Sequence, residues 1–132
     1  MSGSGQNLTG VWNGQYDYAF GYEPVGFMAT LIEAGAGFSG GVSETAPDRS
    51  GAPVDLFAMI DGRREGHSVH FTKTYDGSGG WEHVVEYEGT LSADGNEIEG
   101  EWRVPGAMNG RFMMIRPDRN IQTTDQRIVE KV

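Results

Sequence analysis

The sequence has no cysteine, no long apolar run and few basic residues. Without cysteine, disulfide bonds, thiol catalysis and thiolate metal sites are all excluded. No apolar run approaches the ~20 residues that a membrane-spanning helix needs. Lysine and arginine number 10 against 19 aspartates and glutamates, for a net charge of −9. Such a charge argues against binding to nucleic acid or to an anionic membrane, both of which require a basic surface.

The 132 residues are expected to form one domain. Residues 1–7 lack the basic and apolar regions of a signal peptide, so a flexible N-terminus and a cytoplasmic location are expected. Residues 8–116 carry the domain, and residues 117–132 form a polar tail in which Thr124 and Asp125 could cap a short helix. The sequence contains no G-x-S-x-G, phosphate loop or H-E-x-x-H motif, and no cofactor is predicted.

What the sequence does contain is an apolar–polar alternation with a period of two, which indicates strands with one covered face. The predicted strands are residues 8–20, 27–33, 38–44, 54–62, 69–75, 83–91, 97–104 and 110–116. No helical pattern separates them. About eight short strands without helices are typical of a closed barrel or a sandwich, and we predict an all-β, up-and-down antiparallel barrel.

The connections between these strands alternate in length. The second, fourth and sixth connections are short, whereas the others are longer, including a polar loop over residues 45–53 with two prolines. In an up-and-down meander, odd connections share one end of the barrel and even ones share the other. We therefore predict a tight end and a loop-rich mouth.

The turns at residues 76–80 and 92–96 fix a register for the strands around them. Centring each turn pairs Lys73 with Val85, Tyr75 with His83 and Tyr87 with Trp102, always on one face. A barrel of about eight strands just fills its own interior or holds one small ligand. Four small inward residues are expected to leave room for a ligand: Gly40, Ala58, Gly89 and Gly100.

Gly10-Val11-Trp12 at the head of the first strand and Arg116 at the end of the last, in a meander of eight strands, resemble the calycin group of lipocalins, fatty-acid-binding proteins and avidins. In that group the tryptophan of a G-x-W closes the barrel and an arginine of the final strand packs over it. The resemblance implies these roles for Trp12 and Arg116. Residues 69–91 also look like the middle hairpin of an avidin, although the biotin-contacting pattern does not carry over. The resemblance implies binding of a small, mostly apolar molecule inside the barrel.

Lys73, Tyr75 and His83 are the best candidates for chemistry, because they lie on adjacent strands, face inward and sit toward the mouth. A desolvated lysine can act as a base or Schiff-base nucleophile, a histidine can move protons, and a tyrosine can donate to an oxyanion. The structural alternative, which we favour, is that Lys73 extends to the rim and His83 hydrogen-bonds to Tyr75.

Inward aromatic residues could line a pocket for a flat ligand, or simply form the core of a small barrel. The core reading is favoured for Trp12. The ligand-binding candidates, in addition to the three polar residues, are Tyr18, Phe20, Trp81, Tyr87, Trp102 and Phe112. Trp81 lies in a mouth loop and is the preferred lid residue.

The histidines do not form a metal site by spacing, because His67 lies in a turn, His70 faces outward and His83 faces inward. Glutamates of the sixth and seventh strands form an acidic outer face. Calcium binding there is conceivable, but a solvated face with a Glu86–Arg103 pair is favoured. No metal is predicted.

Several strands are also apolar on their outward side, which a monomeric barrel should not expose. The outward apolar residues are Met28, Ile32, Phe57, Met59, Met113 and Ile115. Either the tail or another subunit covers them, and we favour a homo-oligomer packed through the barrel walls.

Three functions follow from these observations. The first is a small-molecule-binding barrel that holds a compact, mostly apolar or aromatic ligand, with polar contacts from Lys73, Tyr75 and His83. The second is a small barrel enzyme of the isomerase or cyclase type, in which the same three residues perform acid–base chemistry. The third is an oligomerising structural barrel with no ligand.

Overall fold

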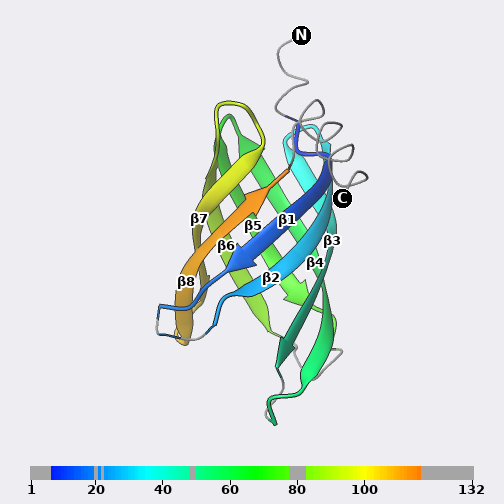
Figure 1. Cartoon of the computed structure of the whole chain (residues 1–132). Helices are drawn as coiled ribbons and strands as arrows, with labels where there is room; N and C mark the ends of the chain where they lie inside the picture. Colours follow the sequence, from blue (N-terminus) through cyan, green and yellow to red (C-terminus); the bar gives the residue numbers. More distant parts are fainter. Residues whose placement is uncertain (1–6, 20, 22, 48–49, 78–82, 117–132) are drawn as a thin grey trace, which may run out of the picture.

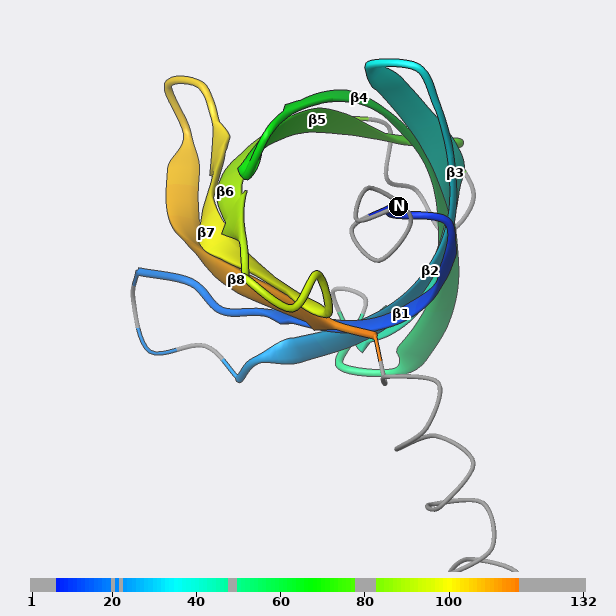
Figure 2. The ribbon, with the colours of Figure 1, turned by 90° about the horizontal axis from the view of Figure 1, so that it is seen from above.

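The computed structural model describes residues 7–19, 21, 23–47, 50–77 and 83–116. It contains eight strands: β1 (Gly10–Tyr16), β2 (Val25–Ala34), β3 (Gly37–Pro47), β4 (Pro53–Glu65), β5 (Ser68–Tyr75), β6 (Val84–Leu91), β7 (Glu97–Val104) and β8 (Met108–Ile115). Each strand pairs antiparallel with the next, and β8 pairs with β1, which closes the barrel (Figures 1 and 2). The predicted all-β, up-and-down barrel is confirmed. In this described part of the chain, no helix is long and apolar enough to cross a membrane.

The register predicted from the turns is also confirmed. Lys73 pairs with Val85, and Tyr87 pairs with Trp102. The backbone N–H of Tyr75 donates to the carbonyl of His83 at 3.3 Å. In β5, buried and exposed residues alternate without interruption, which places Lys73 and Tyr75 inside the barrel. One face of each strand therefore builds the core, as the period of two requires.

Several strand boundaries differ from those predicted. β1 ends at Tyr16 rather than at residue 20. In the described residues beyond Tyr16, the backbone N–H groups of Asp17 and Ala19 still donate to carbonyls of β8, but pairing with β2 does not continue. The predicted loop over residues 45–53 is wrong, since β3 runs to Pro47 and β4 begins at Pro53. These two prolines pair with each other at the last position of the ladder, where a missing N–H interrupts no further pairing.

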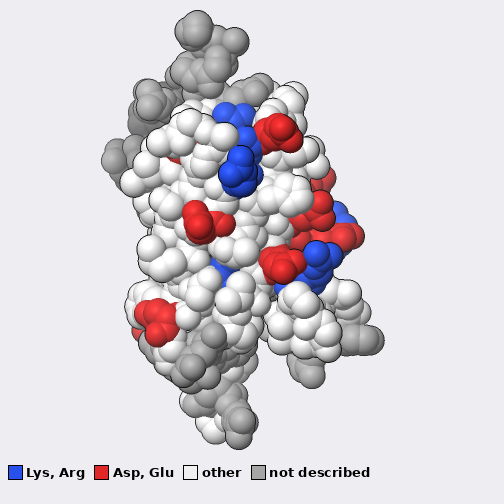
Figure 3. Space-filling model, turned by 180° about the vertical axis from the view of Figure 1, so that it is seen from behind, with Lys and Arg blue, Asp and Glu red and all other residues white. Residues whose placement is uncertain are grey.

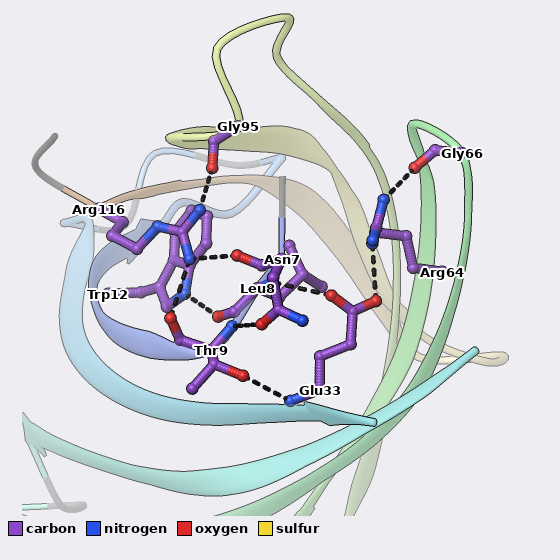
Figure 4. A network of polar contacts seen from close by, with 9 residues as sticks. All are labelled: Asn7, Leu8, Thr9, Trp12, Glu33, Arg64, Gly66, Gly95 and Arg116. Carbon is purple, nitrogen blue, oxygen red and sulfur yellow. Dashed lines mark hydrogen bonds and ion pairs between the residues drawn. The ribbon is translucent and has the colours of Figure 1, made fainter. Parts of the chain in front are cut away.

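The tight end is closed around Arg116. Its guanidinium lies 4.6 Å from the centre of the Trp12 ring and donates to the backbone carbonyls of Asn7, Thr9 and Gly95 (Figure 4). The Trp12 indole N–H in turn donates to the carbonyl of Leu8 at 2.9 Å. A stacked cation with several carbonyl acceptors fixes the chain entering β1 against the chain leaving β8. The predicted placement of Trp12 and Arg116 at this end is confirmed.

A partly buried ion pair completes the closure. Glu33 accepts hydrogen bonds from Arg64 Nε at 2.7 Å and from the backbone N–H of Leu8 at 2.8 Å (Figure 4). Thr9 Oγ1 accepts from the backbone N–H of Glu33. The segment before β1 is thus tied to β2 and β4 as well as to β8. No ligand can enter the barrel from this end without breaking these contacts.

The small inward residues do not leave room for a ligand, contrary to expectation. A Cβ atom on Gly40 would lie 2.0 Å from the carbonyl oxygen of Thr30, and one on Gly100 would lie 2.0 Å from that of Glu88. A Cβ on Gly89 would meet the Phe112 ring at 2.9 Å. The barrel wall bends inward at these glycines, and neighbouring backbone or rings occupy the space where a side chain would be.

Aromatic rings fill the middle of the barrel. Phe71 and Tyr87 stack at 4.6 Å between ring centres, and Phe112 packs edge-on against both. Phe38 adds another edge contact to Phe71 at 5.9 Å. This aromatic layer separates the closed end from the polar residues nearer the mouth.

Candidate functional site

A carboxylate lies at the centre of the polar residues inside the barrel. Glu44 is 5% exposed and accepts hydrogen bonds from Tyr16 Oη at 2.7 Å, Tyr75 Oη at 2.9 Å and Lys73 Nζ at 3.0 Å. These four residues, the Glu44 cluster, come from β1, β3 and β5 and meet across the lumen. Charge-assisted hydrogen bonds are stronger than neutral ones, so the cluster links three strands that are not all neighbours.

The ammonium of Lys73 is enclosed by aromatic rings as well as paired with Glu44. Its Nζ atom lies 4.6 Å from the ring centre of Tyr16, 4.9 Å from that of Tyr75 and 5.3 Å from those of Phe27 and Tyr87. Lys73 is only 1% exposed. Ring faces attract cations, and together with the carboxylate they offset the loss of water around the ammonium.

Burial changes the acid–base properties of this cluster. It lowers the pKa of Lys73, against the opposing effect of the Glu44 charge. It raises the pKa of both Tyr16 and Tyr75, and the neighbouring carboxylate raises them further. The tyrosines are therefore held neutral, as donors to Glu44. The arrangement is a preformed set of hydrogen-bond donors and one acceptor in an apolar surrounding.

Sequence reasoning missed Glu44, although the signal was present. Gly40 was assigned to the inward face of the third predicted strand, and two more steps of two residues reach Glu44. Because that strand was taken to end there, before a polar loop, the residue was not placed inside. In the structure, β3 continues inward to Ala46, which is buried.

Above the Glu44 cluster, at the mouth, lies a small cavity of about 10 Å³. Its lining residues are Tyr16, Tyr18, Lys73, Tyr75, His83, Val85, Tyr87, Trp102 and Met108. A volume of this size holds roughly one water-sized group. The described side chains thus leave little space at this place, where aromatic rings and the lysine ammonium meet.

Two aromatic residues build the outer rim of this mouth cavity. The Tyr18 and Trp102 rings pack edge-on at 5.2 Å, and the Trp102 indole N–H donates to the carbonyl of Asp17 at 2.7 Å. His83 packs against Tyr75, with ring centres 5.0 Å apart. Burial and the nearby Lys73 charge lower the pKa of His83, so the imidazole is neutral at pH 7.

The structure brings most of the predicted ligand-binding residues to this cavity. Tyr18, Lys73, Tyr75, His83, Tyr87 and Trp102 all line it. Phe112 does not, because it lies in the aromatic layer against Phe71 and Tyr87. Three predictions fall outside the described residues: Phe20, Trp81 as the lid residue, and the tail helix. Met108, which was predicted to lie in a loop, begins β8.

The histidines are spread as expected. His67 Nδ1 is 2.9 Å from the carbonyl of Leu91 in a turn, and His70 lies on the outer surface, 3.5 Å from Glu88. Within the described ranges, no three histidine, aspartate or glutamate side chains come together in a way that could hold a metal ion. The predicted Glu86–Arg103 pair is present on the outer surface at 3.0 Å.

A larger hollow, of about 770 Å³, lies on the outside of the barrel rather than within it. It lies over β5 to β8, and its charged side chains are already paired, as in His70–Glu88 and Arg111–Glu101. Exposed pairs of this kind are solvated and weakly bound. The mouth cavity is far smaller, but its polar groups are desolvated and converge, which is the arrangement that specific small-molecule sites use.

No family model and no curated protein matches this chain. Among solved structures, the chain is similar to a de novo designed fluorescence-activating β-barrel, with a TM-score of 0.55 and 13% sequence identity. The similarity covers 88% of this chain and 99% of the designed one. At this identity the likeness establishes the fold alone. Membership of the calycin group is not confirmed.

Proposed function

We propose that this protein is a small-molecule-binding barrel that takes a compact, mostly apolar or aromatic ligand at its mouth. The observation that carries the proposal is the asymmetry of the interior. One end is sealed by Arg116, Trp12 and the Glu33–Arg64 pair, whereas the mouth cavity of the other end borders the desolvated Glu44 cluster. The similarity to a designed fluorescence-activating barrel is consistent with this function.

Because the cavity is small, the ligand must displace side chains at the rim. Tyr18 and Met108 line the cavity but are not fully buried, so they can turn outward at lower cost than the core residues beneath. Burial of the ligand's apolar surface would contribute roughly 25 cal/mol per Å², and the polar residues below would select its identity. The ligand would thereby occupy the upper interior only, above the aromatic layer.

The alternative of a small barrel enzyme needs a free base near the ligand. Lys73 is paired with Glu44 instead, and the two tyrosines donate to the same carboxylate. These contacts hold the groups in one protonation state and favour recognition over proton transfer. The second candidate function, acid–base catalysis, would depend on His83, because its neutral imidazole can accept a proton.

Native mass spectrometry of freshly purified protein tests the binding function. We expect an additional small mass on the folded protein that disappears on denaturation, and a loss of this mass in Val85→Trp, which fills the cavity. A matched variant, Val84→Trp, adds the same ring on the exposed face of the same strand and should retain the ligand. Equal ligand retention by both variants would place the ligand elsewhere and contradict the proposal.

We also propose that copies of the protein associate through one wall of the barrel. The outward side chains of β1, β2 and β3 include no charged residue, and they adjoin apolar parts of β4 and β8. The apolar wall consists of Val11, Met28, Ile32, Phe57, Met59, Met113 and Ile115, each between 41% and 61% exposed. Exposed apolar area of this extent, free of charge, is characteristic of protein interfaces.

The rest of the barrel surface is different. β5 to β8 carry the charged wall, with outward His70, Glu86, Glu88, Glu99, Glu101, Arg103 and Arg111. Figure 3 shows acidic and basic side chains gathered together along one edge of the face that it draws, with a smaller group of basic side chains near the top and scattered acidic ones elsewhere. Two chains of charge −9 repel each other, so an uncharged wall is the surface through which they can approach.

The size of the apolar wall suits a second copy. A standard interface takes ~800 Å² from each partner, about a tenth of the 8333 Å² surface of this molecule. The apolar wall draws on the outward faces of β1, β2, β4 and β8, and the uncharged outward face of β3 lies between β2 and β4. An isologous dimer in which this wall packs on itself would cover it with the same surface.

A further inference from the structure

The hydroxyl of Tyr87 stands out among the buried polar groups. Tyr87 is 3% exposed, and its ring is held by the stack with Phe71 and the edge contact with Phe112. Among the described residues, however, its hydroxyl has no hydrogen-bond partner, unlike those of Tyr16 and Tyr75. A buried polar group without a partner is rare and costs roughly 1–3 kcal/mol, so it calls for an explanation in each case.

Lys73 also has N–H groups that make no hydrogen bond to the described residues. An ammonium carries three N–H groups, and in the described part of the chain the Lys73 side chain has one hydrogen-bond acceptor, Glu44 Oε1. Its Nζ atom lies 5.3 Å from the centre of the Tyr87 ring. The unused N–H groups of Lys73 and the unpartnered O–H of Tyr87 are thus both donors, and both residues line the mouth cavity.

The mouth cavity, which both residues line, has the volume of one oxygen-sized group, about 10 Å³. Tyr16 and Tyr75 line it too, but their hydroxyls already donate to Glu44. The cavity therefore presents donors and aromatic surface, while the Glu44 carboxylate, which is not one of its lining groups, already accepts from three donors. An acceptor atom placed there would satisfy Tyr87 and Lys73 without disturbing the Glu44 cluster.

We propose that the mouth cavity is a subsite for the carbonyl oxygen of a neutral aromatic ligand, bound by the Tyr87 hydroxyl and the Lys73 ammonium. This inference rests on the proposed binding function and specifies its ligand class. The ligand is neutral because Lys73 is already balanced by Glu44, so a ligand carboxylate would bring a second negative charge into the interior with no cation to balance it. Its ring occupies the rim, beside Tyr18 and Trp102, where edge-on and stacked aromatic contacts are available.

Isothermal titration calorimetry with three probes of similar size tests the subsite. Acetophenone carries the carbonyl, ethylbenzene lacks an acceptor, and benzoate adds a negative charge. We expect acetophenone to bind about tenfold more tightly than either of the others, the gain from pairing a buried donor. In Tyr87→Phe, acetophenone should lose about fivefold in affinity and ethylbenzene should lose nothing.

Tyr87→Phe also provides its own folding control. Because the hydroxyl has no partner to lose, the variant should unfold at the same or a higher urea concentration than the original protein. If acetophenone and ethylbenzene bind equally, or if Tyr87→Phe leaves the preference for acetophenone unchanged, the cavity holds a water molecule and the carbonyl subsite is refuted. If no probe binds at all while the protein is folded, the binding function itself fails along with the subsite.

Discussion

At the scale of single residues, Glu44 determines the state of the interior. Three donors converge on it, and Lys73 depends on it for its counter-charge. Removing one partner of a buried ion pair leaves the other charge uncompensated, which typically costs 3–5 kcal/mol. The stability of the barrel should thus be unusually sensitive to this one carboxylate.

Glu44→Gln is therefore expected to lower the free energy of unfolding by about 3 kcal/mol, measured by urea denaturation. Glu86→Gln is the matched control, since Glu86 forms an exposed pair with Arg103 and should cost less than ~1 kcal/mol. Similar effects of the two substitutions would mean that Lys73 does not depend on Glu44 as its counter-charge.

The buried tyrosines predict an alkaline limit to stability. The pKa values of Tyr16, Tyr75 and Tyr87 are raised in the folded protein by burial, so above about pH 10 the unfolded chain loses phenolic protons that the folded chain keeps. Stability should fall there by up to about 4 kcal/mol per pH unit for the three together. The lowered pKa of Lys73 acts in the opposite sense, but only below its ordinary value of 10.5.

Urea unfolding at several pH values between about 9 and 12 measures this slope, with Tyr87→Phe as the comparison. Removing one of the three tyrosines should reduce the slope by about one third. A stability that is flat above pH 10 would contradict the assignment of these side chains to a water-free interior. So would a tyrosinate absorbance of the folded protein larger than the two other tyrosines, Tyr18 and Tyr22, can supply.

The residue scale is also where prediction from sequence was weakest. Alternation alone placed Lys73, Tyr75 and Tyr87 on the inward face correctly, because the turns around these strands are well defined. The favoured expectation that Lys73 extends to the rim was wrong, since its side chain is 1% exposed and paired with Glu44. Glu44 was missed because its position depends on where β3 ends. The partner of a buried charge cannot be derived from periodicity, since the Glu44–Lys73 contact crosses the lumen between strands that do not pair with each other.

At the scale of elements, the strands from β5 to β7 were predicted nearly to the residue and the β3–β4 hairpin was not. The turns after β5 and β6 are rich in glycine and polar residues, which fixes their position and hence the register. Pro47 and Pro53 indicated a loop, but they lie at the ends of two long strands. Proline marks a strand end in this hairpin, not the absence of a strand.

The two glycines at the centre of β3 provide a test of the filled interior. Gly40 points inward, where a Cβ would lie 2.0 Å from the Thr30 carbonyl oxygen, whereas a Cβ on Gly41 would meet nothing within 4 Å. Gly40→Ala should lower the free energy of unfolding by about 2 kcal/mol through overpacking. Gly41→Ala should leave it unchanged or raise it by up to ~1 kcal/mol.

Thermal or urea unfolding of both variants measures the difference. The pair is closely matched, because the substitution is identical and the positions are adjacent in one strand. Equal stabilities would mean that the interior has room at Gly40 after all, as the sequence suggested. The sequence could not decide this, because a small residue indicates either a void or a close approach of neighbouring backbone.

At the scale of the whole molecule, the two ends of the barrel differ, and so do its two walls. One end is tight and the other is the mouth, and one wall is apolar while the other is charged. The alternation of loop lengths predicted the ends, and the outward side chains predicted that one wall would be apolar. Of the contacts that close the tight end, only the one between Trp12 and Arg116 was expected. The Glu33–Arg64 pair was not predicted, because it joins strands that are far apart in the sequence.

Association through the apolar wall predicts that Met59→Lys yields a monomer. Met59 is 61% exposed and gives no core packing, so the substitution should leave folding intact. Thr90→Lys adds the same charge to the exposed face of β6, outside the apolar wall, and should remain a dimer. Analytical ultracentrifugation measures both. A protein that is monomeric before any substitution would exclude self-association, and the tail would then be the segment to test.

The central claim is that the ligand enters the mouth, and amide chemical-shift mapping by nuclear magnetic resonance tests it most directly. Adding acetophenone to uniformly ¹⁵N-labelled protein should shift the amide signals of Tyr18, Tyr75, His83, Val85 and Trp102, which surround the mouth cavity. The signals of Trp12, Glu33 and Arg64 at the tight end should not move. Shifts confined to Thr72, Glu88 and Arg111, around the outer hollow, would contradict the account and place the binding site on the outside of the barrel.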